Sequence, residues 1–147
     1  MEREYFLALE KLKNNSSLAL NEVIEQLAFN EQGLIPVITQ DAKTKTMLMF
    51  AWMNKDTLKQ SIEERKAIYW SRSRKKVWVK GEESGHIQHI QEILLDCDKD
   101  SLIIKVKQEG GIACHTGRES CFYNQIDMES DNLIDVEPII KDPNEIY

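Results

Sequence analysis

The chain has 147 residues, 41% of them hydrophobic and 30% charged, which is typical of one soluble globular domain. No stretch approaches the ~18 apolar residues of a membrane span, and the first residues lack the hydrophobic run of a signal peptide, so we expect a cytoplasmic protein with no membrane partner. The formal net charge of −6 argues against general nucleic-acid binding.

The N-terminal region, residues 1–32, is predicted to be a helical extension. Two helices are expected at residues 2–13 and 18–28, and a polar run at 14–17 separates them. In the second helix, apolar residues recur at the i, i+3, i+4 and i+7 positions from Leu20, which predicts one buried face. We assign this extension no chemistry.

From residue 34 the apolar pattern changes to short runs that predict strands. The expected elements are strands at 34–39 and 46–53, a helix from Asn54 or Asp56 to about residue 66, and strands at 67–73, 76–80, 87–97 and 102–108. This order predicts an α+β fold in a single domain, with mostly antiparallel strands in a barrel-like sheet and a few helices. Residues 126–147 carry seven acidic side chains and one basic side chain. They predict an acidic C-terminal tail, either a solvated arm or an edge element around residues 136–140.

The first chemistry-bearing motif is Asp96-Cys97-Asp98-Lys99-Asp100. Side chains alternate in an extended chain, so the three aspartates would converge on one side and Cys97 would point to the other. Clustered carboxylates repel one another unless a hard cation such as Mg²⁺ lies among them. The alternative is a polar turn that ends the preceding strand, because acids are common turn residues.

The second motif places Cys114 and Cys121 seven residues apart, which is two turns of a helix or the two ends of a loop folded at Gly117. With Cys97 they make three thiols in a chain without a secretion signal, which suits a zinc site better than disulfides. The fourth zinc position would be open or filled by a histidine such as His115, which could also serve as a general base. The alternative is three unrelated buried thiols.

The third motif, residues 69–81, interleaves aromatic and basic side chains on a predicted hairpin. One face of its first strand carries Trp70, Arg72 and Arg74, and one face of the second carries a tryptophan between two lysines. Rings stack on bases and guanidinium groups bind phosphate, so the hairpin suits a nucleotide, and the loop at 81–85 could offer N–H groups to an anion. The alternatives are a face for single-stranded RNA and a solvated cationic edge.

Taken together, these segments resemble the phosphoribosyl-AMP cyclohydrolase family over roughly residues 33–125. The DCDxD and ACHTGxxSCF motifs, in this order, form a highly specific pair. Arg65 departs from the pattern, since relatives often have glycine before the YWSRSR strand. The matching stretches are FAWMN at 50–54, YWSRSR at 69–74, WVKGEESG at 78–85 with Gln88, DCDKD at 96–100, and GGIACHTGRESCF at 110–122.

The resemblance implies a hydrolase that opens the N1–C6 bond of the adenine ring of phosphoribosyl-AMP. The product would be the phosphoribosylformimino-aminoimidazole carboxamide ribotide, in the third step of histidine biosynthesis. The resemblance also implies a homodimer with a shared zinc site, in which one chain supplies Cys97 and the other supplies Cys114 and Cys121. Many relatives carry a downstream pyrophosphohydrolase domain, for which this chain leaves no room, so we expect the monofunctional form.

The resemblance further implies Mg²⁺ at Asp96, Asp98 and Asp100. We expect His115 to shuttle protons, and Trp70 or Trp78 to flank the base. Two other readings stay open: a different zinc-dependent nucleotide hydrolase, although the H-x-E and P-C-x-x-C pair of deaminases is missing, and a zinc-stabilised RNA-binding module. The expected substrate-binding residues are Trp70, Ser71, Arg72, Ser73, Arg74, Lys80, Ser84 and Gly85.

Overall fold

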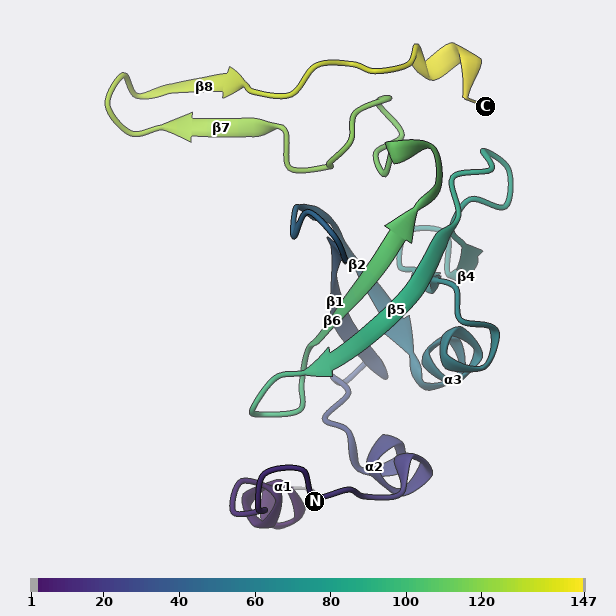
Figure 1. Ribbon diagram of the computed structural model, residues 1–147, viewed down its shortest axis with the longest axis vertical. Coiled ribbons are helices and arrows are strands. Elements are labelled where there is room, and N and C mark those ends of the chain that lie inside the picture. The colour runs from purple at the N-terminus through teal and green to yellow at the C-terminus, as the bar shows by residue number, and fades with distance from the viewer. Residues whose placement is uncertain (1–2, 147) are drawn as a thin grey trace.

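The computed structural model describes residues 3–146 (Figure 1). No helix in this described part is long and apolar enough to cross a membrane. The elements in chain order are α1 (Arg3–Leu9), α2 (Leu20–Gln26), β1 (Leu34–Asp41), β2 (Met47–Asn54), α3 (Lys55–Glu64), β3 (Ile68–Ser71), β4 (Lys76–Val79), β5 (Gln88–Leu95), β6 (Leu102–Gln108), η1 (Glu109–Gly111), β7 (Asn124–Asp127), β8 (Asn132–Asp135) and η2 (Pro143–Glu145).

The N-terminal extension contains the two predicted helices, α1 and α2, each shorter than expected; residue 2 of the first prediction lies outside the described residues. The amphipathic pattern of the second helix is confirmed for Val23, Ile24 and the adjoining Leu27, which join or pack against the hydrophobic core, but Leu20, at its start, is 51% exposed. Figure 1 shows both helices at one end of the molecule and the C-terminal tail at the other. The extension therefore covers one end of the core and lies away from the tail.

The central sheet has four strands in the order β2-β1-β6-β5. Most pairs are antiparallel, as predicted, and the exception is the parallel pair of β1 and β6. The predicted β1–β2 hairpin turns at Asp41, whose Oδ1 accepts hydrogen bonds from the backbone N–H groups of Lys43 and Thr44 at 2.9 and 2.8 Å. Alternate residues of the strands face one buried side, as the zero exposure of Val37 and Ile104 illustrates.

The expected barrel-like sheet is wrong, because the backbone ladders do not close into a barrel. Strands β3 and β4 pair only with each other and form a separate sheet. One isolated bridge, Lys66 with His89, and a hydrogen bond from the N–H of Ala67 to the carbonyl of Gln88 at 2.9 Å join this hairpin to β5. The register of β5 against β6 also shifts between Ile90 and Glu92, which interrupts the regular pairing on that edge.

Side-chain hydrogen bonds join the β3–β4 hairpin to the central sheet across the interior, where no regular backbone ladder connects them. The hydroxyl of Tyr69 on β3 lies 2.6 Å from Thr39 Oγ1 on β1, and it donates to Gln88 Oε1 on β5, also at 2.6 Å. Gln88 Nε2 donates to Gln108 Oε1 at 2.8 Å, and Gln108 donates in turn to the carbonyl of His86. The bonds among Tyr69, Thr39, Gln88 and Gln108 are buried, and an unpaired polar group is costly there, so they fix the hairpin against the sheet.

Helix α3 is held at both ends. Asn54 and Thr57 form a reciprocal capping box at its start, which confirms Asn54 as one of the two proposed caps. Ser61 Oγ accepts a hydrogen bond from the N–H of Ile68 at 3.0 Å and ties the helix to β3. The helix ends at Arg65, whose φ of 57° lies in the left-handed region that favours glycine. The glycine that relatives often carry here suits this conformation.

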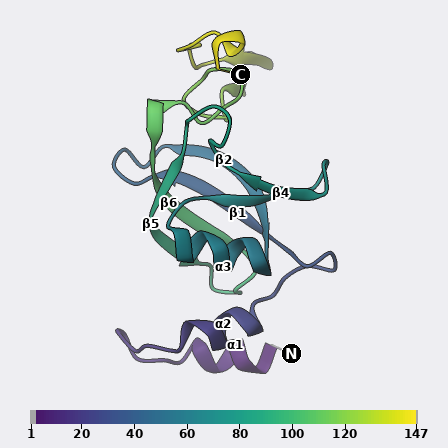
Figure 2. The same ribbon diagram turned by 90° about the vertical axis from the view of Figure 1, so that its right-hand side faces the viewer.

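The C-terminal tail is largely exposed, which agrees with the solvated arm that was one of the two alternatives from the sequence, and residues 136–140 form no edge strand. Within the tail, strands β7 and β8 form a two-stranded hairpin, and the chain continues without a strand to η2. Figures 1 and 2 show this hairpin projecting beyond the sheet at the end opposite the N-terminal helices. The sequence did not predict this hairpin, because the apolar pattern at Gln125–Ile126 and Leu133–Ile134 is too short to stand out from the surrounding acidic residues.

We predict that Arg65→Gly raises the free energy of unfolding by about 0.5–1 kcal/mol, because glycine avoids the cost of a side chain in the left-handed region. Urea unfolding at neutral pH measures the change. Arg65→Ala is the matched control, since it removes the side chain and keeps the backbone cost, and it should give no gain. An equal gain in both variants would show that the side chain, not the backbone conformation, sets the effect.

Candidate active site

The DCDKD motif lies in the tight turn between β5 and β6 and not in a strand. Strand β5 ends at Leu95, and Lys99 in the turn has a φ of 59°. Asp96 Oδ1 accepts a hydrogen bond from the N–H of Asp100 at 2.9 Å and closes the turn. The three aspartates do converge, with carboxylate oxygens within 4.8 Å of one another. The predicted cluster is therefore present, but the turn produces it and strand alternation does not.

The electrostatics of this aspartate cluster suit a cation. The hydrogen bond with Asp96 raises the pKa of Asp100, and burial and the charges of Asp96 and Asp98 raise it further. Burial opposes ionisation of Asp96, but hydrogen bonds from Asp100 and Ser101 outweigh it and lower the pKa of Asp96. One carboxyl group thus holds its proton more tightly because its neighbour is ionised. A set of close oxygen donors with this repulsion fits a hard divalent ion such as Mg²⁺.

The second motif forms a folded loop, residues 113–121, which we call the cysteine loop. Of the two arrangements open from the sequence, the loop is therefore correct and the helix is not. The N–H of Cys114 donates to the carbonyl of Arg118, and the N–H of Gly117, at a φ of 85°, donates to the carbonyl of Cys114. The N–H of Cys121 donates to the carbonyl of Leu48 at 2.7 Å, which attaches the end of the loop to β2.

The cysteine loop carries two thiols, those of Cys114, which is buried, and of Cys121, which has an exposed edge. Burial of the Cys121 thiol, and next the charge and hydrogen bond of Cys114, raise the pKa of Cys121 to about 12. Two neighbouring sulfur donors fit a soft or borderline cation such as Zn²⁺, which binds cysteine as thiolate.

Lys80 lies under the cysteine loop and not on an exposed phosphate-binding edge. Its side chain is only 5% exposed, and Nζ donates a 2.6 Å hydrogen bond to the carbonyl of Ala113, next to Cys114. Burial lowers the pKa of Lys80, and the thiols of Cys121 and Cys114 oppose that shift. The ammonium group also lies 5.4 Å from the ring centre of Trp78. Lys80 therefore positions the loop and faces its sulfur atoms.

Cys97 does not join the other two cysteines in one protomer. It is exposed in the turn before β6, whereas Cys114 and Cys121 follow the end of β6, a strand of seven residues that spans about 20 Å. Among residues 3–146, the three aspartates are the only group of three or more potential metal ligands that lie together. A site with all three cysteines needs a second chain.

A cavity of about 680 Å³ is bounded by the β3–β4 hairpin, the loop after β4 and the cysteine loop. It brings together His115 and Cys121 from the cysteine loop with five of the eight expected substrate-binding residues. Those five are Ser71, Ser73, Arg74, Lys80 and Ser84. The cavity thus joins one half of the candidate zinc site to basic and hydroxyl side chains.

The other three expected residues lie outside the cavity lining. Strand register pairs Tyr69 with Trp78, so Trp70 is on the opposite face of the hairpin. Arg72 instead has its guanidinium 4.5 Å from the ring centre of Trp52. Gly85 uses its N–H in a 2.8 Å hydrogen bond to the carbonyl of Gly81, so that N–H is not available to an anion.

Three lining residues, Met49, Glu82 and Glu83, were given no role from the sequence. Trp78 and Lys76, which the sequence placed on one face of the hairpin, also line the cavity, so Trp78 is the tryptophan that faces it. The register of β3 with β4 puts Trp78 on this side, and nothing in the composition of the hairpin revealed that register.

The comparisons with known proteins cover this site. The family model described as Phosphoribosyl-AMP cyclohydrolase matches residues 49–123, which include the cavity, the aspartate cluster and the cysteine loop. The chain is 50% identical over 136 residues to the phosphoribosyl-AMP cyclohydrolase of Burkholderia lata, covering 91% of this chain and 99% of that protein. It is 48% identical, with the same coverage, to that of Burkholderia cenocepacia.

A relative from another genus agrees with these. The phosphoribosyl-AMP cyclohydrolase of Vesicomyosocius okutanii is 55% identical over 124 residues, which is 84% of this chain and 97% of that protein. The matches span most of each protein and contain both metal-type motifs in the expected order. This chain belongs to the phosphoribosyl-AMP cyclohydrolase family.

Proposed function

We propose that this protein hydrolyses the N1–C6 bond of phosphoribosyl-AMP, the ring-opening step of histidine biosynthesis. The observation that carries the proposal is the cavity in which His115 and Cys121 face Arg74 and Trp78, inside the segment that matches the cyclohydrolase family. The family match favours this reading over another nucleotide hydrolase or an RNA-binding module. Incubation with phosphoribosyl-AMP, followed by ultraviolet spectroscopy with and without a chelator, tests it.

The substrate has chemical features that this cavity can recognise. Its adenine carries a ribosyl phosphate on N1, so the ring is cationic and C6 is electrophilic. The face of Trp78 can stack on such a ring, and Glu82 and Glu83 bring negative charge to the same cavity. Arg74 and Lys76 are available to bind phosphate.

We propose that Zn²⁺ is held by Cys114 and Cys121 of one protomer and by the partner subunit's Cys97. The influence of Cys114 on the pKa of Cys121 and the position of Cys97 at the far end of β6 support this arrangement. When bound, Zn²⁺ would supply Lewis-acid activation of the attacking water. Lys80 would hold the backbone at Ala113 and place positive charge beside the sulfur atoms.

His115 is the proposed proton shuttle. It lines the cavity and directly follows Cys114, which places its ring near the reacting centre. In the proposed reaction a bond forms between the water oxygen and C6, and the N1–C6 bond breaks. His115 would accept the proton lost by the water and return it to the leaving nitrogen.

The aspartate cluster is proposed to bind Mg²⁺. It shares its turn with Cys97, so a second chain that delivers Cys97 to the zinc site also delivers Asp96, Asp98 and Asp100 to the same cavity. There Mg²⁺ could bind a phosphate or a ribose hydroxyl of the substrate. Each active site would then combine residues of two protomers.

A mixing experiment tests the shared zinc site. Cys97→Ala and Cys114→Ala should each abolish turnover and reduce zinc content. When the two inactive variants exchange subunits at random, half of the dimers are mixed, and each mixed dimer regains one of its two sites, giving about a quarter of wild-type activity. Mixing Cys114→Ala with Cys121→Ala is the control and should restore nothing. No recovery in the first mixture would show that sharing is wrong.

The role of His115 is tested separately. His115→Ala should lower kcat by about 10²–10⁴-fold and leave the zinc content unchanged, because the side chain moves protons and is not a ligand. His89→Ala is the matched control, since His89 pairs with Glu109 outside the cavity, and its kcat should stay within about twofold of wild type. Steady-state kinetics and metal analysis distinguish the outcomes. Loss of zinc from the His115→Ala variant would instead show that His115 is a zinc ligand.

Magnesium binding is tested by stability. In metal-free protein at pH 7, Asp100→Asn should raise Tm, because it removes a carboxylate whose ionisation the neighbouring aspartates oppose. The raised pKa of Asp100 means that the wild-type penalty disappears as the pH falls through that pKa, so the difference in Tm should narrow in acid. Added MgCl₂ should stabilise wild type and not the variant, with KCl at equal ionic strength as control. Equal stabilisation of both would exclude the cluster as the magnesium site.

A further inference from the structure

The β7–β8 hairpin, residues 124–135, which we call the arm, has an apolar surface that no other part of residues 3–146 covers. Figures 1 and 2 show the arm projecting from the end of the molecule that carries the cysteine loop. Ile126, Leu133 and Met128 are 75%, 66% and 85% exposed. An isolated two-stranded hairpin is marginal in water, so a surface of this kind is expected to pack against another element.

The exposed side chains lie on one face of the arm. Ile126 pairs directly with Leu133 in the register of the two strands, so both point to the same side. Alternation places Met128, in the turn, on that side as well. Ile134 lies on the opposite face and is less exposed. The arm therefore has one strongly apolar face and one mixed face.

The base of the arm is anchored to the cysteine loop. Arg118 of the loop donates from Nη2 to Asp135 Oδ2 at 2.5 Å and from Nε to the carbonyl of Glu137 at 3.1 Å. Its guanidinium also lies 3.9 Å from the ring centre of Tyr123. These contacts give the arm a defined direction, and they connect it to the half of the zinc site that its own chain supplies.

A matching apolar row crosses the outer face of the four-stranded sheet. Strand register places Phe50, Ile38, Ile103 and Leu94 side by side, one from each of β2, β1, β6 and β5. Phe50 is 48% exposed and Leu94 is 41% exposed, whereas residues on the inner face of the same strands are buried. The row spans three strand spacings, about 14 Å, which suits a two-stranded hairpin laid across it.

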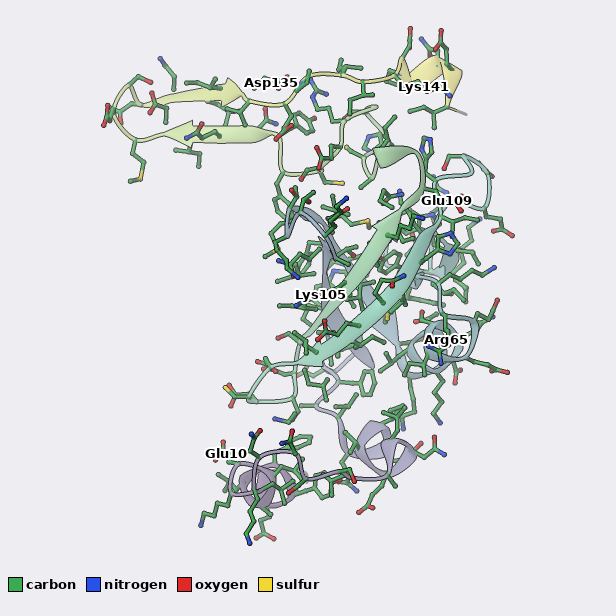
Figure 3. All side chains as sticks on the ribbon, in the orientation of Figure 1. Glu10, Arg65, Lys105, Glu109, Asp135 and Lys141 are labelled. Carbon is green, nitrogen blue, oxygen red and sulfur yellow. The ribbon has the colours of Figure 1, made fainter. Side chains whose placement is uncertain are left out.

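Charge and position agree with this match. The arm carries Asp127, Glu129 and Asp131 around its turn. The face of β6 that holds Ile103 continues with Lys105, which pairs with Glu92 of β5 at 3.5 Å, and with the exposed Lys107. Figure 3 shows Lys105 on the sheet and Asp135 in the arm. Leu94 lies three residues before Cys97, so a second chain that brings Cys97 to the cysteine loop also brings this row to the start of the arm.

We propose that the arm of each protomer packs its apolar face on the outer sheet face of a second copy of this chain, across Phe50, Ile103 and Leu94. The inference rests on the proposed function in one respect, because the shared zinc site is what places the second copy beside the arm. A symmetric pair of arms then holds the two cysteine loops against the two aspartate clusters. The family model ends at residue 123, before the arm, whereas the relatives matched over 91% of this chain align across it.

Sedimentation velocity across a dilution series tests the proposal on the full chain. The double variant Ile126→Ser/Leu133→Ser should weaken the dimer by at least about 100-fold, because each arm loses two buried apolar side chains. Phe50→Ser, on the receiving face, should weaken it in the same direction. Because the substituted side chains on the arm and at Phe50 are exposed in the isolated protomer, circular dichroism should show that the variants fold like wild type. Ile134→Ser, on the other face of the arm, is the matched control and should dimerise like wild type.

The outcomes separate this inference from the proposed function. A dimeric double variant with the wild-type dissociation constant, or a monomeric wild-type protein, would overturn the role of the arm. Equal weakening by Ile134→Ser would also overturn the assignment of the apolar face. Ring opening of phosphoribosyl-AMP is measured in parallel on wild type. If wild type turns over the substrate and the arm variants dimerise like wild type, the proposed function holds and the role of the arm does not. If wild type shows no turnover but the arm variants are monomeric, the role of the arm holds and the proposed function does not.

Discussion

Strand β6 separates the two segments that carry the metal-type ligands, and this separation governs the rest of the structure. The aspartate cluster and Cys97 precede the strand, and the cysteine loop follows it. Because β6 pairs on both sides, with β1 and β5, it cannot bend to bring its ends together. One protomer therefore holds the three aspartates and Cys97 at one end of the sheet and the other two cysteines at the opposite end. This separation is the reason for our proposal that a second copy completes each site.

The interior supports the cysteine-loop end with polar contacts as well as apolar ones. Tyr69, Gln88 and Gln108 connect the hairpin to the sheet through hydrogen bonds that are shielded from water. Lys80 continues this support to the backbone at Ala113. Lys80 opposes the rise in the pKa of the Cys121 thiol, whose ionised form is the one that would bind a metal. The buried ammonium group thus acts on the part of the proposed zinc site that its own chain supplies.

Much of the architecture could be predicted from the sequence because it depends on local patterns. Alternation and turn residues identified six of the eight strands, and the capping pattern at Asn54 identified the start of α3. The convergence of the three aspartates was also predictable, since residues so close in the chain meet in an extended segment or in a tight turn. The β7–β8 hairpin was missed, because its strands are four residues long and lie in an acidic stretch.

The sequence by itself determined the family, the motif residues and the order of the elements, because these depend on residue identity and short-range spacing. Only the tertiary structure decided which side chains share a cavity. The register of β3 with β4 put Trp78 and Trp70 on opposite faces of the hairpin, with Trp78 lining the cavity, and burial placed Lys80 beneath the cysteine loop. Register and burial arise from contacts between residues far apart in the chain. The distance between Cys97 and the other cysteines has the same origin, since the length and pairing of β6 set it.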